Sequence, residues 1–279
     1  MSVQLRLLAF AAILVVAFAT AALAGSAVDV HPGRPTATAM KDAHGMHGAT
    51  APQAVRGLAV SEGGLTLKLA RTTATRGRRF DLAFRIVDRR GRTVRDFDVQ
   101  HTKRMHFIVV RRDMTGFQHL HPTQAADGSW SVPVTLRDAG SYRVFADFSV
   151  GGRAQTLADD VTVDGSVRSQ LLPLPVASAR VDGMRVSLAE GASTAAAESE
   201  LAFDVTRGGT PVRVQPYLGA QGHLVALREG DLAFLHVHPD EHSLRFMAAF
   251  PTAGRYRLFL QFKTDGRVHT AAFTQEVTR

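Results

Sequence analysis

The sequence predicts an all-β protein built from two tandem β-sandwich domains. Short runs alternate apolar and polar residues with the period of two that strands have, and turns containing Gly and Asp separate them. The second half of the chain repeats the order of these runs, and a histidine cluster with the spacing His-x12-His-x-His occurs in both halves. These three observations indicate a duplicated domain in which each copy carries the same cluster.

The alternating runs of the first copy lie at 65–69, 80–87, 130–136 and 141–148. Strands this short, at such close spacing, are typical of a sandwich and not of a βαβ fold. The one helical candidate lies at 189–200, where Gly191 favours a loop at least as strongly.

Four sequence blocks support the duplication. Those at 82–84, 105–112, 117–122 and 139–145 return at 201–203, 222–229, 234–239 and 253–259, at offsets of 119, 117, 117 and 114 residues. We therefore place the two domains at 55–165 and 179–279. Between them, residues 166–178 hold Pro173 and Pro175 among small residues, which predicts a linker.

The N-terminal region differs from the rest. In residues 1–24, Arg6 precedes an uncharged apolar run that ends in Ala22-Leu23-Ala24, a small-x-small pattern typical of a cleaved signal peptide. An uncleaved anchor is the alternative, although the run is short for a membrane span. Residues 25–54 lack apolar periodicity and predict a flexible tether. No later segment is apolar enough to cross a bilayer. From the signal pattern we expect an extracytoplasmic protein, secreted or associated with the cell envelope.

Composition narrows the chemistry. The absence of cysteine excludes disulfides, thiolate metal sites and thiol nucleophiles, so a metal site must use His, Met, carboxylates or backbone. The net charge of +8 comes mainly from arginines in turns with few aromatics among them, which argues against nucleic-acid binding. The chain contains no Gly-x-Ser-x-Gly elbow, phosphate-binding loop or His-Glu-x-x-His helix, so we expect no enzyme.

The repeated cluster consists of His106, His119 and His121 in the first copy and His223, His236 and His238 in the second. A hairpin centred between Asp113 and Met114 places His106 opposite His121, with Cβ atoms roughly 5 Å apart. His119, two residues from His121, points to the same side. By the same argument, His223 lies opposite His238 with His236 beside it. A one-residue slip in register would destroy this arrangement.

Three imidazoles on one face can bind an ion at about 2.0–2.1 Å and leave a fourth position open. Nitrogen donors favour copper(II), with zinc as the alternative metal. The clusters can form two separate sites or one shared site. In the tether, Met40, His44, Met46 and His47 form an accessory candidate that suits copper and can load or deliver it. We expect a metal ion as ligand and a metal-handling envelope protein as partner.

The alternative hypothesis is a non-catalytic structural or interaction module of the envelope. The face that carries the histidines also holds core residues such as Ile108, Val110 and Phe117, so the rings can be core-edge groups with backbone hydrogen bonds. Five further polar residues lack counterparts in the other copy and are expected at the surface or in turns: His101, His242, His269, Asp147 and Asp240.

The blocks Met105-His106-Phe-Ile-Val-Val and Phe117-Gln-His119-Leu-His121-Pro122, followed by the run from Gly140 to Phe148, resemble exported bacterial domains of the YtkA-like kind. The resemblance covers about a third of the chain. It implies an immunoglobulin-like sandwich and an exported role that is either related to heavy metals, as is often the case for such domains, or uncharacterised. A looser similarity to CopC-type copper carriers does not extend to their N-terminal histidine ligand, because the mature chain is expected to begin near Gly25.

Overall fold

The computed structural model describes residues 55–189, 193–235, 237–240 and 242–279. Residues from Thr50 to Arg279 form one compact unit. Every regular element in the described part is a strand, which confirms the predicted all-β class. Those residues include no helix that could cross a membrane. The predicted signal peptide and tether lie outside the described residues.

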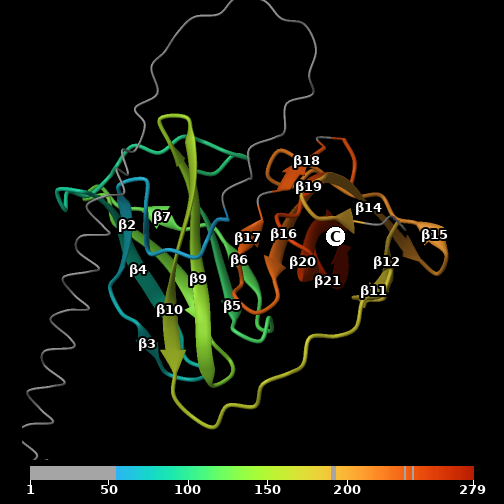
Figure 1. The fold of residues 1–279 in the computed structure, drawn as a ribbon, viewed down its shortest axis with the longest axis horizontal. Coiled ribbons are helices and arrows are strands. Elements are labelled where there is room, and N and C mark those ends of the chain that lie inside the picture. The colour runs from blue at the N-terminus through green and yellow to red at the C-terminus, as the bar shows by residue number, and fades with distance from the viewer. Residues whose placement is uncertain (1–54, 190–192, 236, 241) are drawn as a thin grey trace, which may run out of the picture. The chain divides into compact units, whose positions relative to one another are not determined.

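The first copy, residues 55–165, is described throughout and consists of two facing sheets (Figure 1). One has the strand order β1 (Ser61–Glu62), β2 (Leu65–Leu69), β4 (Arg79–Asp88), β8 (Trp130–Thr135), β7 (Thr123–Gln124). The other has the order β3 (Thr73–Ala74), β10 (Arg153–Val163), β9 (Gly140–Val150), β5 (His106–Arg111), β6 (Gln118–Leu120). Their inner faces enclose a core in which Phe84 stacks on Phe107, with ring centroids 4.8 Å apart.

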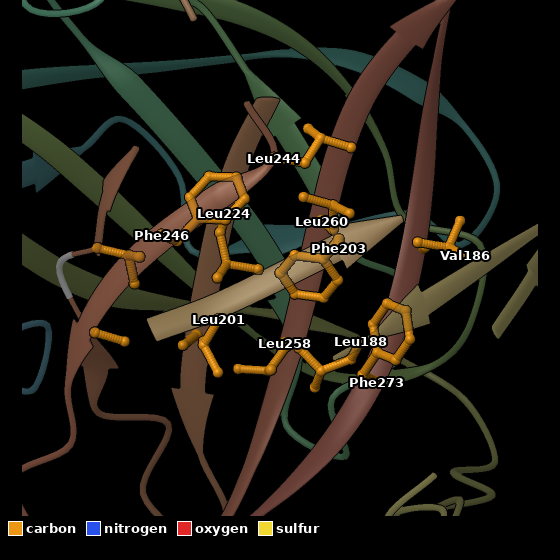
Figure 2. Packing of buried hydrophobic residues seen from close by; sticks show 14 of the residues in the cluster. Val186, Leu188, Leu201, Phe203, Leu224, Leu244, Phe246, Leu258, Leu260 and Phe273 are labelled. Carbon is orange, nitrogen blue, oxygen red and sulfur yellow. The ribbon is translucent and has the colours of Figure 1, made fainter. Parts of the chain in front are cut away.

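The described residues of the second copy repeat this arrangement. One sheet has the order β11 (Ser178–Val181), β12 (Met184–Leu188), β14 (Glu198–Arg207), β19 (Arg245–Ala249), β18 (Val237–Pro239), with β15 (Thr210–Pro211) beside β14. The other has the order β13 (Ser193–Thr194), β21 (Arg267–Thr278), β20 (Gly254–Thr264), β16 (Gly222–Arg228), β17 (Phe234–Leu235). Figure 2 shows side chains from both sheets meeting in the core, among them Phe203 and Phe273, whose ring centroids lie 5.4 Å apart.

The same tyrosine contact closes a turn in both copies. The Tyr142 hydroxyl donates to the carbonyl oxygen of Asp138 at 3.0 Å, and the Tyr256 hydroxyl donates to that of Thr252 at 2.9 Å. Both tyrosines are buried and come from the repeated Ala-Gly-x-Tyr block. A buried tyrosine that bonds to the backbone a few residues upstream is the tyrosine corner of immunoglobulin-like sandwiches. Each copy is therefore an immunoglobulin-like sandwich, as predicted.

The helix considered at 189–200 does not form in the described residues of that stretch. Strand β13 lies there instead, with Thr194 paired to Thr278, and a turn at Ala196 with φ of 60° leads into β14. The Ala196 amide donates to the carbonyl oxygen of Phe250 at 2.8 Å. The backbone thus finds its hydrogen-bond partners on other strands, and long-range pairing overrides the weak helical propensity.

A third apolar cluster joins the two copies. Strand β5 contributes Ile108 and Val110, and β16 contributes their counterparts Val225 and Leu227. Because alternate residues of a strand share a face, these side chains lie on the outer faces of their sheets and away from the cores of the sandwiches. The sequence pattern predicts a place in the core of a sandwich for these residues; they are buried, but in the interface between the copies.

Two aromatic contacts show that this interface is nearly symmetric. Phe117 stacks on Phe259 with ring centroids 4.0 Å apart, and Phe234 contacts Phe145 at 5.6 Å. Phe234 is the counterpart of Phe117, and Phe259 that of Phe145, so the same contact is made once in each direction. Reciprocal contacts of this kind are typical of a twofold, isologous interface.

The segment that precedes β1 binds to both copies. The Phe234 amide donates to the carbonyl oxygen of Arg56 at 2.9 Å, and the Gly57 amide donates to that of Thr156 at 3.1 Å. Gly57 has φ of +71°, and a Cβ atom there would lie 2.8 Å from both Phe145 Cε1 and Phe234 Cβ. Only glycine combines this backbone conformation with so close an approach of side chains from both copies.

Candidate metal site

The hairpin of β5 and β6 has the register that the sequence predicted. Phe107 pairs with Leu120, and Ile108 pairs with His119. The turn that sets this register has Met114 and Gly116 at positive φ. Continuing the register by one pair places His106 opposite His121.

The three imidazoles of the first copy gather at the open end of this hairpin. Ring centroids lie 5.3 Å apart for His106 and His119, 5.1 Å for His106 and His121, and 4.9 Å for His119 and His121. One ligand atom from each residue can be chosen so that all three lie within 4.8 Å of one another. Imidazoles bound tetrahedrally to one ion at 2.0–2.1 Å have ring centroids roughly 5 Å apart. The spacing of these three rings therefore matches that of metal ligands.

Hydrogen bonds determine which nitrogen of His106 is available as a ligand. Its Nε2 lies 3.2 Å from the carbonyl oxygen of Gln100. A carbonyl oxygen only accepts hydrogen bonds, so Nε2 carries the hydrogen, and in a neutral ring the lone pair is on Nδ1.

His119 has the opposite tautomer. Its Nδ1 lies 2.8 Å from Oε1 of Gln261, which belongs to the second copy. The Gln261 amide is oriented by Thr270, whose hydroxyl oxygen accepts from Gln261 Nε2 at 3.2 Å. His119 Nδ1 therefore donates to an amide oxygen, and Nε2 holds the lone pair.

These two lone pairs face each other. His106 Nδ1 and His119 Nε2 are 3.1 Å apart. With both rings neutral in these tautomers, neither nitrogen has a hydrogen to donate, so the close approach is no hydrogen bond. Two nitrogens bound at 2.0–2.1 Å to one ion in a near-tetrahedral site lie roughly 3.3 Å apart. A cation placed between the two nitrogens satisfies both lone pairs.

His121 supplies the third nitrogen. Its Nε2 is buried and has no hydrogen-bond partner among the described residues. Leaving a buried polar atom unpartnered costs about 1–3 kcal/mol, and an ion is one explanation for such an atom. The unpartnered atom lies in a residue whose ring contacts both other imidazoles.

Burial keeps the cluster neutral. Desolvation lowers the pKa of His106 and, more strongly, that of His119, to which neighbouring histidines add repulsion. Desolvation also lowers the pKa of His121 to about 4. A metal binds only to deprotonated nitrogen, so these rings are ready to bind at neutral pH without first losing a proton.

A fourth imidazole comes from the second copy. The ring centroid of His223 lies 6.2 Å from that of His106 and 6.1 Å from that of His119. His223 Nε2 lies 2.9 Å from the carbonyl oxygen of Tyr217, six residues upstream, just as His106 bonds six residues upstream to Gln100. Burial lowers the pKa of His223 to about 4.

A small cavity of about 50 Å³ adjoins the rings of His106, His119 and His223, and Asp147 lines it as well. That volume is enough for an ion with a bound water. The polar lining of this cavity comes from both copies.

The second predicted cluster is only partly described. His236 lies outside the described residues, and of His238 only the backbone is described. Strand β18 pairs with β19, where His238 lies opposite Met247, so the predicted pairing of His238 with His223 in one hairpin is wrong. The chain crosses to the other sheet earlier in the second copy than in the first. Val237 already pairs with Ala248 of β19, whereas its counterpart Leu120 still pairs with Phe107 of β5.

The accessory candidates Met40, His44, Met46 and His47 also lie outside the described residues. The other polar residues had mixed outcomes. His242 and Asp240 are exposed, as expected. His269 was expected at the surface and is instead buried, with Nδ1 2.6 Å from Asp182 Oδ2.

Three residues near the cluster were not predicted to belong to it: Asp147 and His101 were expected at the surface or in turns but line the cavity, and Gln261 was given no role. Asp147 pairs with His106 across β9 and β5, and its Oδ1 accepts from the Thr156 hydroxyl. The exposed His101 has its ring centroid 5.4 Å from that of His223. Gln261 occupies the position that matches Asp147 and reaches His119 of the other copy. The sequence does show that Gln261 stands at the position matching Asp147. That this residue contacts a histidine of the other copy depends on which faces of the two copies meet.

Comparison with solved structures finds similar chains at low identity. The Escherichia coli adhesin FdeC matches with 14% identity and a TM-score of 0.29, over 79% of this chain and 66% of that one. Salmonella alpha-2-macroglobulin reacted with methylamine matches with 16% identity and a TM-score of 0.29, over 82% of this chain and 15% of that one. The chain thus spans less than two thirds of each. The tandem Ig repeats of Dlar match with 8% identity and a TM-score of 0.20, over 77% and 97%.

These scores carry no information about what this chain binds. No curated protein sequence matches the chain. A family model does match, once in each copy, at residues 59–165 and 179–279, and the family has no enzymatic description. The chain therefore belongs to the family described as a domain of unknown function, DUF8832.

Proposed function

We propose that this protein is an exported metal-binding protein that holds its ion between His106, His119 and His121. The observation that carries the proposal is the approach of His106 Nδ1 to His119 Nε2 at 3.1 Å, with the other nitrogen of each ring bonded to an oxygen acceptor. Outer hydrogen bonds that fix the tautomer and orientation of a ligating histidine are a general feature of metal sites.

Copper is the preferred metal. The three described ligands are all imidazoles, and nitrogen donors bind copper(II) more tightly than the other divalent first-row ions, zinc included. Copper(II) favours a tetragonal arrangement of such ligands and zinc a tetrahedral one, so zinc is the second choice because of its lower affinity and not because of its geometry. In an exported protein, tight binding of copper serves sequestration, delivery or tolerance, which is also what the resemblance to YtkA-like domains implies.

Other parts of the proposal rest on the sequence. The apolar run with its cleavage pattern at 1–24 supports export. The segment with Met40, His44, Met46 and His47 is an accessory copper ligand set, and His236 and His238 are further candidates from the second copy. A metal-handling protein of the envelope is the partner from which copper is received or to which it is passed.

Metal titration of the mature protein tests this function. Copper(II) and zinc are added against a competing chelator to the parent protein, to His119→Ala and to His242→Ala, whose histidine is exposed and far along the chain from the cluster. We expect His119→Ala to lose one tightly bound equivalent and His242→Ala to lose none.

The competing function is a structural or interaction module whose histidines only support the hairpin. It is supported if the parent protein binds copper no more tightly than an unstructured peptide containing histidine. It is also supported if His119→Ala keeps every tight equivalent while remaining folded.

A further inference from the structure

We infer that the second copy completes the metal site of the first: Gln261 holds His119 as an Nε2 ligand, and His223 supplies the fourth nitrogen. The inference rests on the proposed metal function and specifies how that site is assembled. Metal binding then depends on the interface between the copies, because a single copy lacks both of these groups.

The role of Gln261 follows from its two hydrogen bonds. Its Nε2 donates to Thr270 Oγ1 at 3.2 Å, which directs Oε1 toward His119 Nδ1 at 2.8 Å. Gln261 is only 8% exposed, so water does not compete for this acceptor. An imidazole whose Nδ1 donates to a buried oxygen must present its Nε2 lone pair, and here that lone pair points at His106 Nδ1, 3.1 Å away.

The comparison of the two copies shows that this arrangement is built on a shared frame. Gln261 pairs with Thr270 across β20 and β21, just as Asp147 pairs with Thr156 across β9 and β10. In the first copy the threonine donates to a carboxylate, and in the second it orients an amide. Asp147 and Gln261 therefore occupy matching positions, each hydrogen-bonded to a threonine of the neighbouring strand. In the second copy the side chain at this position, Gln261, contacts His119 of the first copy.

The role of His223 follows from its strand and its tautomer. On β16 it shares a face with Val225 and Leu227, which pack in the interface, as His106 shares a face with Ile108 and Val110 on β5. His223 Nε2 donates to the Tyr217 carbonyl oxygen, so its Nδ1 holds the lone pair. His223 is 7% exposed and lines the same cavity as His106 and His119.

The distance of His223 from the triad suits a fourth ligand that closes on the ion. Its ring centroid lies 6.1 Å and 6.2 Å from those of His119 and His106, against 4.9–5.3 Å within the triad. A shift of about 1 Å brings it to the spacing from His106 and His119 that is expected for imidazoles bound to one ion. Three ligands from one copy and one from the other would tie the copies together.

Copper(II) titration of the full mature chain tests the role of Gln261. Gln261→Leu removes the acceptor, and loss of such an outer hydrogen bond weakens metal binding about 10–100-fold. Gln261→Glu keeps an acceptor for His119 Nδ1 and is expected to bind at least as tightly as the parent. Gln275→Leu is the matched control, because Gln275 lies on β21 and bonds to Ser193, away from the histidines. If Gln261→Leu does not fold, Thr270→Val tests the same orientation by releasing the amide.

The number of imidazoles on the bound ion tests His223. X-ray absorption of the copper-loaded parent is expected to show four imidazoles at the triad equivalent, and His223→Ala is expected to show three. His242→Ala again serves as the control. If His223 had only a structural role, His223→Ala would lower the urea midpoint without changing the number of imidazoles on the ion. If Gln261 had only a structural role, its variants would lower the urea midpoint, and the tight copper binding expected for Gln261→Glu would not depend on an acceptor for His119 Nδ1.

The two proposals fail in different ways. Tight binding that is lost in His119→Ala but is unchanged in Gln261→Leu, with the same imidazole count in His223→Ala, overturns this inference and leaves the proposed function intact. Absence of tight binding in the parent overturns both. Each half of the inference is decided by its own variant.

Discussion

His106 Nδ1 and His119 Nε2 face each other at 3.1 Å. Each of these nitrogens carries a lone pair, because the second nitrogen of its ring donates to an oxygen. Under the proposed function, an ion bound between the two nitrogens would accept both lone pairs, so this contact would contribute to its affinity.

The tautomers can be observed directly. Nitrogen-15 NMR of the metal-free protein is expected to show His106 protonated on Nε2 and His119 protonated on Nδ1. The spectra are recorded at about pH 7.5, roughly one unit above the ordinary pKa of histidine. A hydrogen on His119 Nε2, which would make the contact with His106 Nδ1 an ordinary hydrogen bond, would contradict this arrangement, and so would a shared proton that makes either ring cationic. His242, which is exposed, provides the reference signal for a ring that exchanges between tautomers.

Stability should depend on pH through the buried histidines. The pKa of His121 and that of His223 are lowered by burial to about 4, whereas an unfolded histidine titrates near 6.5. Between these values the unfolded chain binds more protons, so the free energy of unfolding is highest above pH ~6.5 and falls as the pH drops toward ~4. Urea unfolding at pH 7 and pH 5 measures this loss.

A substitution isolates the contribution of one ring. His121→Gln removes one such titration and is expected to reduce the difference in unfolding free energy between pH 7 and pH 5 by about 1 kcal/mol, since solvent screens part of the effect. An unchanged difference would show that His121 titrates normally in the folded protein.

The buried ion pair of Arg111 and Asp113 should be worth much more than an exposed one. Its side chains are 6% and 9% exposed, and the Asp113 carboxylate also accepts from the backbone amide of Gln170 in the linker. The pKa of Asp113 is lowered to about 2, because Arg111 and backbone amides outweigh the effect of desolvation. Asp113→Asn leaves the guanidinium without its counter-charge and is expected to cost about 3 kcal/mol.

The matched control for that variant is Asp265→Asn. Asp265 pairs with Arg207, and their side chains are 66% and 52% exposed. We expect a loss below about 1 kcal/mol, as is usual for surface pairs. Equal losses in the two variants, measured by urea unfolding, would show that burial does not make the Arg111–Asp113 pair more valuable than an exposed pair.

Two glycines with the same backbone conformation separate strain from steric overlap. Gly57 and Gly77 have φ of +71° and +70°, but a Cβ atom at Gly77 meets nothing within 4 Å, whereas one at Gly57 overlaps Phe145 and Phe234. Gly77→Ala is expected to cost about 1–2 kcal/mol from strain alone. Gly57→Ala should cost about 1–3 kcal/mol more, because it overpacks the interface. Similar unfolding free energies would mean that the segment at Gly57 moves away freely.

Much of the fold could be predicted because its signals are local. The alternation in β4, β8 and β9 follows from the two faces of a strand, and the tyrosine corners follow from a repeated block. The register of β5 and β6 was predictable as well, since a short turn leaves few ways to pair two alternating strands. The triad of the first copy depends only on that register and was therefore found.

What could not be predicted depends on contacts between distant strands. His238 follows the same motif as His121, but its backbone pairs with Met247 of β19, in the other sheet of its sandwich. His269 is buried, and its Nδ1 lies 2.6 Å from Oδ2 of Asp182, 87 residues away.

The sequence by itself determined the two sandwiches, their duplication and the histidine spacing. Strand alternation, the repeated order of the blocks and the spacing of residues are all patterns along the chain. The tertiary structure decided that the outer faces of β5 and β16 meet, and with this that Gln261 of one copy orients His119 of the other. The physical reason is that apolar residues on the outer face of a strand must be buried somewhere, but their pattern does not say against which surface.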